Sequence, residues 1–91
     1  MEPAEIHQME GFDPRKRMFN RNIFVYKKLK TFSAHFKYED LFLESSHFPT
    51  TTEAIDELVK MAQDKGFSRL RTRLNFKGKK YLTELEPWID G

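Results

Sequence analysis

TTTEAIDELVKMAQDKG, residues 50–66, predicts a helix whose beginning, buried face and end can all be read from its residues, so the other elements must pack on it. Thr50 and Glu53 have the capping-box spacing, in which side chains and backbone N–H groups bond reciprocally at a helix N-terminus. Gly66 suits the left-handed position that often follows a helix, and Phe67 can then fold back on the last turn. We therefore expect a helix that begins at Thr50 and ends before Gly66.

Apolar residues recur along this helix at a spacing of three and four, which places them on one face. These residues are Ala54, Ile55, Leu58, Val59 and Ala62. Acidic residues and Lys60 take the opposite side. One face is therefore predicted to be buried against another layer.

The segments on both sides of the helix alternate between apolar and polar residues, which is typical of half-buried strands. Five strands are predicted in this way, at residues 22–30, 31–38, 41–45, 67–76 and 79–85. The join at Lys30 and Thr31 has no Gly, Asn or Pro, so either a hairpin or one long bent strand fits it. A tight turn is expected at residues 38–40, and a two-residue hairpin loop at Lys77 and Gly78.

Residues 1–20 contain Pro3, Gly11 and Pro14 and show no sustained period, which predicts a flexible N-terminal arm. Residues 21–91 are expected to form one α+β domain. Its predicted architecture is a four- or five-stranded antiparallel sheet with one α-helix on one face, in the order β-β-β-α-β-β. A chain of 91 residues has room for one core of this kind.

The composition excludes several classes of protein. The chain contains no cysteine, which removes disulfides, thiol catalysis and cysteine-based zinc sites. It has no apolar run long enough to cross a bilayer, and its first ten residues are acidic and polar, so we expect a cytoplasmic protein without a membrane partner.

Charge is distributed unevenly along the chain, although the net charge is only +2. Residues 15–37 hold eight basic residues and no acidic one, and residues 65–80 hold seven more, again without an acid. Acidic residues dominate the stretch between these two blocks. A basic face of this kind can attract phosphate even when the whole chain is nearly neutral.

Alternation places three arginines on one side of the strand at 67–76, roughly 7 Å apart. This spacing is close to the phosphate repeat of a nucleic acid, and lysines extend the row around the hairpin. A second basic group lies in the expected arm. The candidate nucleic-acid-binding residues are Arg69, Arg71, Arg73, Lys77, Lys79, Lys80, Arg15, Lys16, Arg17 and Arg21. The alternative is a solvated face whose arginines form salt bridges, with Glu84 and Glu86 as cross-strand partners.

Neither catalysis nor metal binding has a recognisable pattern. His7, His35 and His47 are not at metal-ligand spacing, and the neighbouring residues Ser45 and Ser46 do not make a triad with His47. The four glycines are scattered, so no nucleotide-binding loop is present. We therefore expect a protein that is not an enzyme and has no cofactor.

Most aromatic residues are expected in the core, including Phe42, Phe76, Tyr81 and Trp88. Phe24 and Tyr26 are the exception, because Ile23, Val25 and Leu29 already fill the other face of their strand. If both rings are exposed beside Lys28 and Lys30, they form either an aromatic and basic platform or an edge for self-association.

The run of strands followed by FPTTTEA, residues 48–54, and an amphipathic helix resembles the arm-type DNA-binding domains at the N-termini of tyrosine recombinases. In that family three strands precede a helix that starts with an F-x-T-x-x-E-A pattern, and the sheet reads DNA. The resemblance covers residues 32–62, and the two strands predicted after the helix depart from it. It is an analogy of architecture and assigns the chain to no family.

These patterns predict a non-enzymatic binding module whose basic row and basic arm contact the phosphates of a nucleic acid. The alternative is a protein-protein interaction module, or a homodimer, that uses a sheet edge or the acidic face of the helix. The two differ in their response to salt, because phosphate contacts weaken steeply as salt rises and apolar contacts do not.

Overall fold

A computed structural model of the protein describes residues 2–77, 80–82 and 86–91. The elements, in chain order, are β1 (Glu5–Phe12), β2 (Met18–Lys28), β3 (Thr31–Tyr38), β4 (Leu41–Glu44), α1 (Thr51–Asp64), β5 (Ser68–Lys77), β6 (Lys80–Tyr81) and β7 (Ile89–Asp90).

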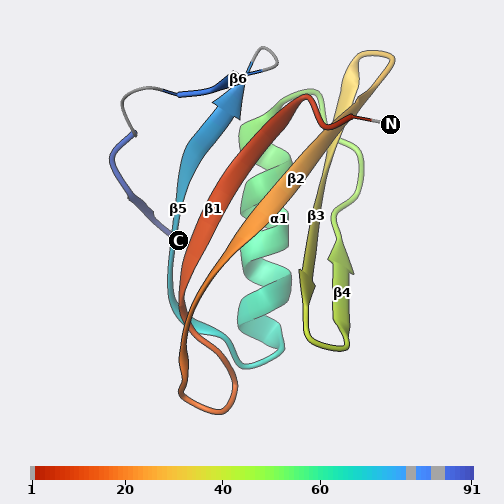
Figure 1. Ribbon diagram of the computed structural model, residues 1–91. Helices are drawn as coiled ribbons and strands as arrows, with labels where there is room; N and C mark the ends of the chain where they lie inside the picture. The colour runs from red at the N-terminus through yellow and green to blue at the C-terminus, as the bar shows by residue number, and fades with distance from the viewer. Residues whose placement is uncertain (1, 78–79, 83–85) are drawn as a thin grey trace.

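One antiparallel sheet and one helix make up the described fold (Figure 1). The strands lie in the order β4-β3-β2-β1-β5-β6, and the short β7 pairs with β5 beside β6. The helix α1 packs on one face of this sheet, chiefly against β3 and β4. The predicted α+β class is therefore confirmed, but the main path of the sheet has six strands instead of four or five.

The prediction of a flexible arm over residues 1–20 does not agree with this topology. Residues Glu5–Phe12 form β1, which lies between β2 and β5 and pairs with both. Its Met9 is completely buried. The sequence conceals this strand because polar residues such as Gln8 and Glu10 occupy the outward positions, and Gly11 interrupts the period at a bulge. An antiparallel sheet can leave one face in solvent, so the outward positions of a central strand can be polar.

The open question at residues 30–31 is resolved in favour of a hairpin. Lys28 pairs with Thr31, so Leu29 and Lys30 form a two-residue loop. Leu29 has a φ of 58°, which a leucine rarely adopts, and its side chain is 88% exposed. The expected turn after Tyr38 is confirmed, since Tyr38 pairs with Leu41.

The two-residue loop predicted at Lys77 and Gly78 does not include Lys77, because Lys77 pairs with Lys80 in the sheet. Gly78 lies outside the described residues. The end of the strand predicted at 79–85 also lies partly outside them, because residues 83–85 are not described.

The predicted helix and its C-terminal end are confirmed, and so is the half of the capping box in which the Thr50 hydroxyl accepts a backbone bond. The Thr50 Oγ1 accepts a hydrogen bond from the Glu53 backbone N–H at 3.2 Å and donates one to the Glu53 carboxylate at 2.9 Å. At the other end, the Phe67 N–H donates to the Ala62 carbonyl at 3.1 Å, with Gly66 at a φ of 102° between them. This is the Schellman arrangement.

The core lies between α1 and the sheet. The apolar face of the helix packs chiefly against β3. Four rings of the core contact one another: Phe19, Phe36, Tyr38 and Phe67. Their centroids are 5.3 to 6.3 Å apart. This core covers one face of the sheet, and α1 does not cover the opposite face.

Candidate functional site

The sheet face opposite α1, here called the outer face, carries aromatic rings where a solvated face would carry polar groups. Phe24 and Tyr26 from β2 and Phe42 from β4 lie on it, with exposed fractions of 36% for Phe24 and 57% for Phe42. The described residues provide no second layer that would cover them. The platform that the sequence allowed for Phe24 and Tyr26 is therefore present, and the expectation that Phe42 belongs to the core is wrong.

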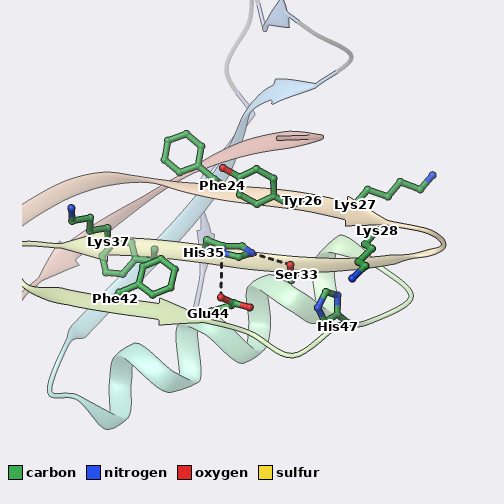
Figure 2. Close-up of a pocket in the computed structure, with 11 residues that line it drawn as sticks. Phe24, Tyr26, Lys27, Lys28, Ser33, His35, Lys37, Phe42, Glu44 and His47 are labelled. Atoms are coloured by element: carbon green, nitrogen blue, oxygen red, sulfur yellow. Dashed lines mark hydrogen bonds and ion pairs between the residues drawn. The ribbon is translucent and has the colours of Figure 1, made fainter. Parts of the chain in front are cut away.

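His35 of β3 lies between the rings of the two neighbouring strands (Figure 2). Its ring centroid is 4.8 Å from that of Tyr26, at an interplanar angle of 83°, and 6.0 Å from that of Phe42. Edge-to-face packing of this kind fixes the ring orientations. A groove of about 650 Å³ follows this row of rings across β2, β3 and β4.

Both ring nitrogens of His35 have an oxygen close by, as the dashed lines in Figure 2 show. Nε2 lies 3.0 Å from the Ser33 hydroxyl, and Nδ1 lies 3.7 Å from the Glu44 carboxylate. These contacts hold the imidazole in place at the centre of the groove.

Cationic side chains surround the apolar floor of the groove. Lys28 at one end and Lys37 at the other are both exposed. Lys27 also borders the groove, but its Nζ lies 5.7 Å from the centre of the Phe32 ring on the helix side of the sheet. Glu44 is the one carboxylate among the residues that line this groove. The groove therefore combines flat rings with a net positive charge.

Arg71 and Arg73 of the predicted arginine row lie on the same outer face but contact groups of the protein itself. Arg71 is 3.6 Å from the Glu10 carboxylate and 3.3 Å from that of Asp90. The Arg73 Nε donates to the Gln8 side chain at 2.8 Å, and its guanidinium lies 4.1 Å from the centre of the Trp88 ring. Trp88 thus covers arginines and not the core.

The other basic residues of the predicted row do not continue the regular alternation of Arg71 and Arg73. Arg69 has a φ of 52° at a register shift between β1 and β5, so the strict alternation starts only after it. Lys77 is exposed at the end of β5. Lys79 and the side chain of Lys80 lie outside the described residues.

The second basic group lies at the turn between β1 and β2 instead of in an arm. Arg15 and Lys16 are exposed there. The Arg17 side chain bonds the carboxylates of Asp13 at 2.8 Å and Glu39 at 2.9 Å.

Arg21 is separated from the outer-face arginines. It pairs with the buried Met9 on the helix side of the sheet and lies 5.2 Å from the centre of the Tyr38 ring. The structure therefore brings Arg71 and Arg73 together but does not join them to this basic group.

Asp13, which sequence reasoning did not single out, organises this turn. Its carboxylate is 1% exposed and accepts hydrogen bonds from the Tyr38 hydroxyl at 2.7 Å and from the backbone N–H groups of Arg15 and Arg17 at 2.9 Å each. Burial acts to raise the pKa of Asp13, but these bonds and the Arg17 side chain outweigh it and lower the pKa from 3.8 to about 2. With these donors, the carboxylate holds the turn between β1 and β2 to β3.

The groove could have been found from the sequence with one further step. Leu41 and Leu43 share the buried face of β4, so Phe42 between them had to point outward. The same argument puts Ser33, His35 and Lys37 of β3 on the outer face. The alternation of β3 and β4 shows on which side of the sheet each of their side chains lies. Phe42 was nevertheless assigned to the core together with most of the other aromatic residues.

Comparison with known proteins gives no relative: no family model matches the chain, and neither a curated protein nor a solved structure is significantly similar to it. Within the described residues no helix is long and apolar enough to span a membrane, and no group of three or more potential ligands is arranged around a metal position.

Proposed function

We propose that the protein binds single-stranded nucleic acid in the aromatic groove of the outer face. The observation that supports this function best is the row of Phe24, Tyr26 and Phe42 around His35, between exposed lysines. Bases stack on such rings, and each stacked base contributes about 1–3 kcal/mol. Lys28 and Lys37 are placed to neutralise phosphates on either side.

The chemistry of the groove favours a single strand over a duplex. A ring can stack only on a base whose face is exposed, and in a duplex both faces of each base are already stacked. The groove is lined by residues of β2, β3 and β4 and by His47 of the loop before α1, and none of its lining residues belongs to a helix that could enter a major groove. Phosphate contacts alone would not distinguish the two forms.

The predicted basic residues take a secondary part in this proposal. Arg71 and Arg73 already contact Glu10, Asp90 and Gln8, so releasing them to bind phosphate has a cost. The lysines of the β5–β6 hairpin and the exposed Arg15 and Lys16 contribute mainly to the long-range attraction of the strand.

The test is a titration of labelled single- and double-stranded DNA and RNA of mixed sequence, at low and at near-physiological salt. We expect tighter binding to single strands, with an affinity that falls as salt rises. Phe42→Ala should weaken binding about tenfold, which corresponds to one stacked base.

The lysines are tested with a matched pair of variants. Lys28→Gln with Lys37→Gln should lower the salt slope by about 2, whereas Lys60→Gln with Lys65→Gln, which removes the same charge on the helix side, should leave it nearly unchanged. Absence of binding by the wild-type protein at low salt contradicts the proposal, and so does an equal effect of the two double variants.

A second candidate function is self-association through β4. This strand ends the sheet with one neighbour among the described residues, and Phe42 is exposed beside its free edge. Pairing of two β4 edges would give a homodimer. Sedimentation analysis over a concentration series would detect it, and the association would persist at high salt, unlike phosphate binding.

A further inference from the structure

A second concavity lies on the outer face, toward the other end of β2. It has a volume of about 640 Å³, and its lining includes Met18, Asn20, Arg69 and Arg71. Met18 is 82% exposed, although it is a large apolar side chain. Because side chains two apart in a strand share a face, Met18 and Asn20 lie on the same side of the sheet as Phe24.

The strand β2 joins the two concavities without a break. Asn22 and Asn20 lie between the rings of the aromatic groove and Met18 of the second concavity, and both are exposed. The six outer-face positions from Met18 to Lys28 cover ~34 Å at about 3.4 Å per residue. An extended nucleic-acid strand advances by roughly 6–7 Å per nucleotide, so this distance corresponds to about five nucleotides, within the range that single-strand modules cover.

Two basic residues that line the second concavity, Arg21 and Arg69, have no ion-pair partner among the described residues, in contrast to Arg71, which lies near Glu10 and Asp90. Arg21 pairs with Met9 on the helix side of the sheet and lies against the Tyr38 ring, which leaves Arg69 as the unpaired cation for the outer face. Arg69 is exposed, and its φ of 52° places it at the bulge between β1 and β5. A strained residue of this type persists only where the surrounding structure holds it.

The bulge depends on Gly11 of β1. Gly11 has a φ of 155°, and a Cβ atom there would lie 2.7 Å from the Ser68 carbonyl oxygen and 2.9 Å from that of Arg69. Only glycine permits this close approach, so the backbone at Arg69 is set by the packing of the two strands. Bulges of this kind redirect a side chain at the end of a sheet.

From this continuity we infer that the bound strand runs along β2 through both concavities, and that Arg69 holds a phosphate at its far end. This inference rests on the proposed function and adds its footprint, a single strand of about five nucleotides. The amides of Asn20 and Asn22 then face the bases between the two concavities, where an amide can both donate and accept.

A length series tests the footprint. Oligothymidine and oligouridine probes of three, six and nine nucleotides would compete with a labelled longer strand at low salt. We expect the affinity to rise at least about tenfold from three to six nucleotides and to change little, apart from the statistical gain, from six to nine.

Arg69→Gln tests the far contact, with Lys65→Gln as the control that removes one nearby charge. Arg69→Gln should lower the affinity for the hexamer about threefold or more and reduce the dependence of log affinity on log salt by about 1. The affinity for the trimer should stay within error of the wild-type value. In spectra of the amide groups, the hexamer should shift Asn20 and Asn22, whereas the trimer should shift only residues of the aromatic groove. Thermal melting of the variants confirms that they are folded.

The outcomes separate the two proposals. A trimer that binds as tightly as the hexamer, or an Arg69→Gln variant that weakens both lengths equally, overturns the footprint and leaves the proposed function standing. Failure of the wild-type protein to bind any of the three lengths overturns the proposed function, and the footprint with it.

Discussion

At the residue scale, Asp13 shows how one buried carboxylate fixes a turn in a chain without disulfides. It ties the β1–β2 turn to the Tyr38 hydroxyl of β3 and to two backbone N–H groups. The hydrogen bonds also raise the pKa of Tyr38, because a phenol that donates to a carboxylate holds its proton. The same contacts place Arg17 between Asp13 and Glu39.

We predict that Asp13→Asn lowers the melting temperature by roughly 5 °C or more at neutral pH, because a neutral amide cannot accept all of these bonds. The pKa of Asp13 is lowered in the folded protein from 3.8 to about 2. Its contribution to stability is therefore complete above pH 4 and is lost as the pH falls toward 2. Melting curves between pH 2 and pH 7 measure both effects.

The control for this prediction is Asp40→Asn, at an exposed position in the turn between β3 and β4. This variant should melt close to the wild-type protein at neutral pH. If Asp13→Asn keeps the full loss of stability between pH 4 and pH 2, another carboxylate is responsible for it.

At the element scale, the turn of the β2–β3 hairpin contains a residue in an unfavourable backbone conformation, and a substitution can relieve this strain. Leu29 has a φ of 58° and packs against almost nothing. The left-handed conformation costs an ordinary residue about 1–2 kcal/mol, and asparagine adopts it more readily. We predict that Leu29→Asn raises the free energy of unfolding by about 0.5–1 kcal/mol.

Denaturant unfolding would measure this gain, with Lys30→Asn as the matched control in the same loop. Lys30 has no positive φ, so its replacement should bring no comparable stabilisation. A Leu29→Asn variant that is less stable than the wild-type protein would show that Leu29 makes a contact the structure does not reveal.

Elements whose signals are local could be predicted from the sequence. The helix followed from Thr50, Glu53 and Gly66, and β3 followed from its alternation, because caps and alternation depend only on near neighbours. The choice between a hairpin and one bent strand after β2 could not be made from the sequence, because the turn holds Leu29 at a positive φ that no glycine or asparagine indicates.

Features that depend on distant partners were missed or incomplete. The burial of β1 results from its two neighbouring strands, one of which is some 60 residues away along the chain. Of the arginine row, Arg71 and Arg73 were placed correctly on one face, but the partners of Arg71, Glu10 and Asp90, lie near opposite ends of the sequence. To predict the groove, one must know for β2, β3 and β4 together which side chains face away from the helix.

At the scale of the whole molecule, the two faces of the sheet differ in charge. The helix presents its acidic residues on one side, and the groove presents exposed lysines on the other. A polyanion is therefore expected to approach the groove side more readily than the acidic face of the helix, which orients it before contact. Salt should therefore change the association rate more than the dissociation rate.

The topology makes a further prediction about the N-terminal segment, which the sequence alone presented as an arm. Removal of a mobile arm leaves a domain folded, but removal of β1 separates β2 from β5 and exposes Met9's neighbours in the core. We predict that a chain beginning at residue 14 loses cooperative unfolding, because the bonds of β1 to both strands are lost. Circular dichroism during thermal denaturation measures this.

A chain that lacks only residues 2 and 3 is the control, since pairing with β2 begins with the Ala4 N–H, which donates to the Val25 carbonyl at 2.7 Å. That variant should melt cooperatively, within a few degrees of the full chain. If the chain beginning at residue 14 also melts cooperatively and binds nucleic acid unchanged, β1 is dispensable. The aromatic groove on β2, β3 and β4 would then be a site that half of the sheet supports, and Arg69 on β5 would make no contribution to binding.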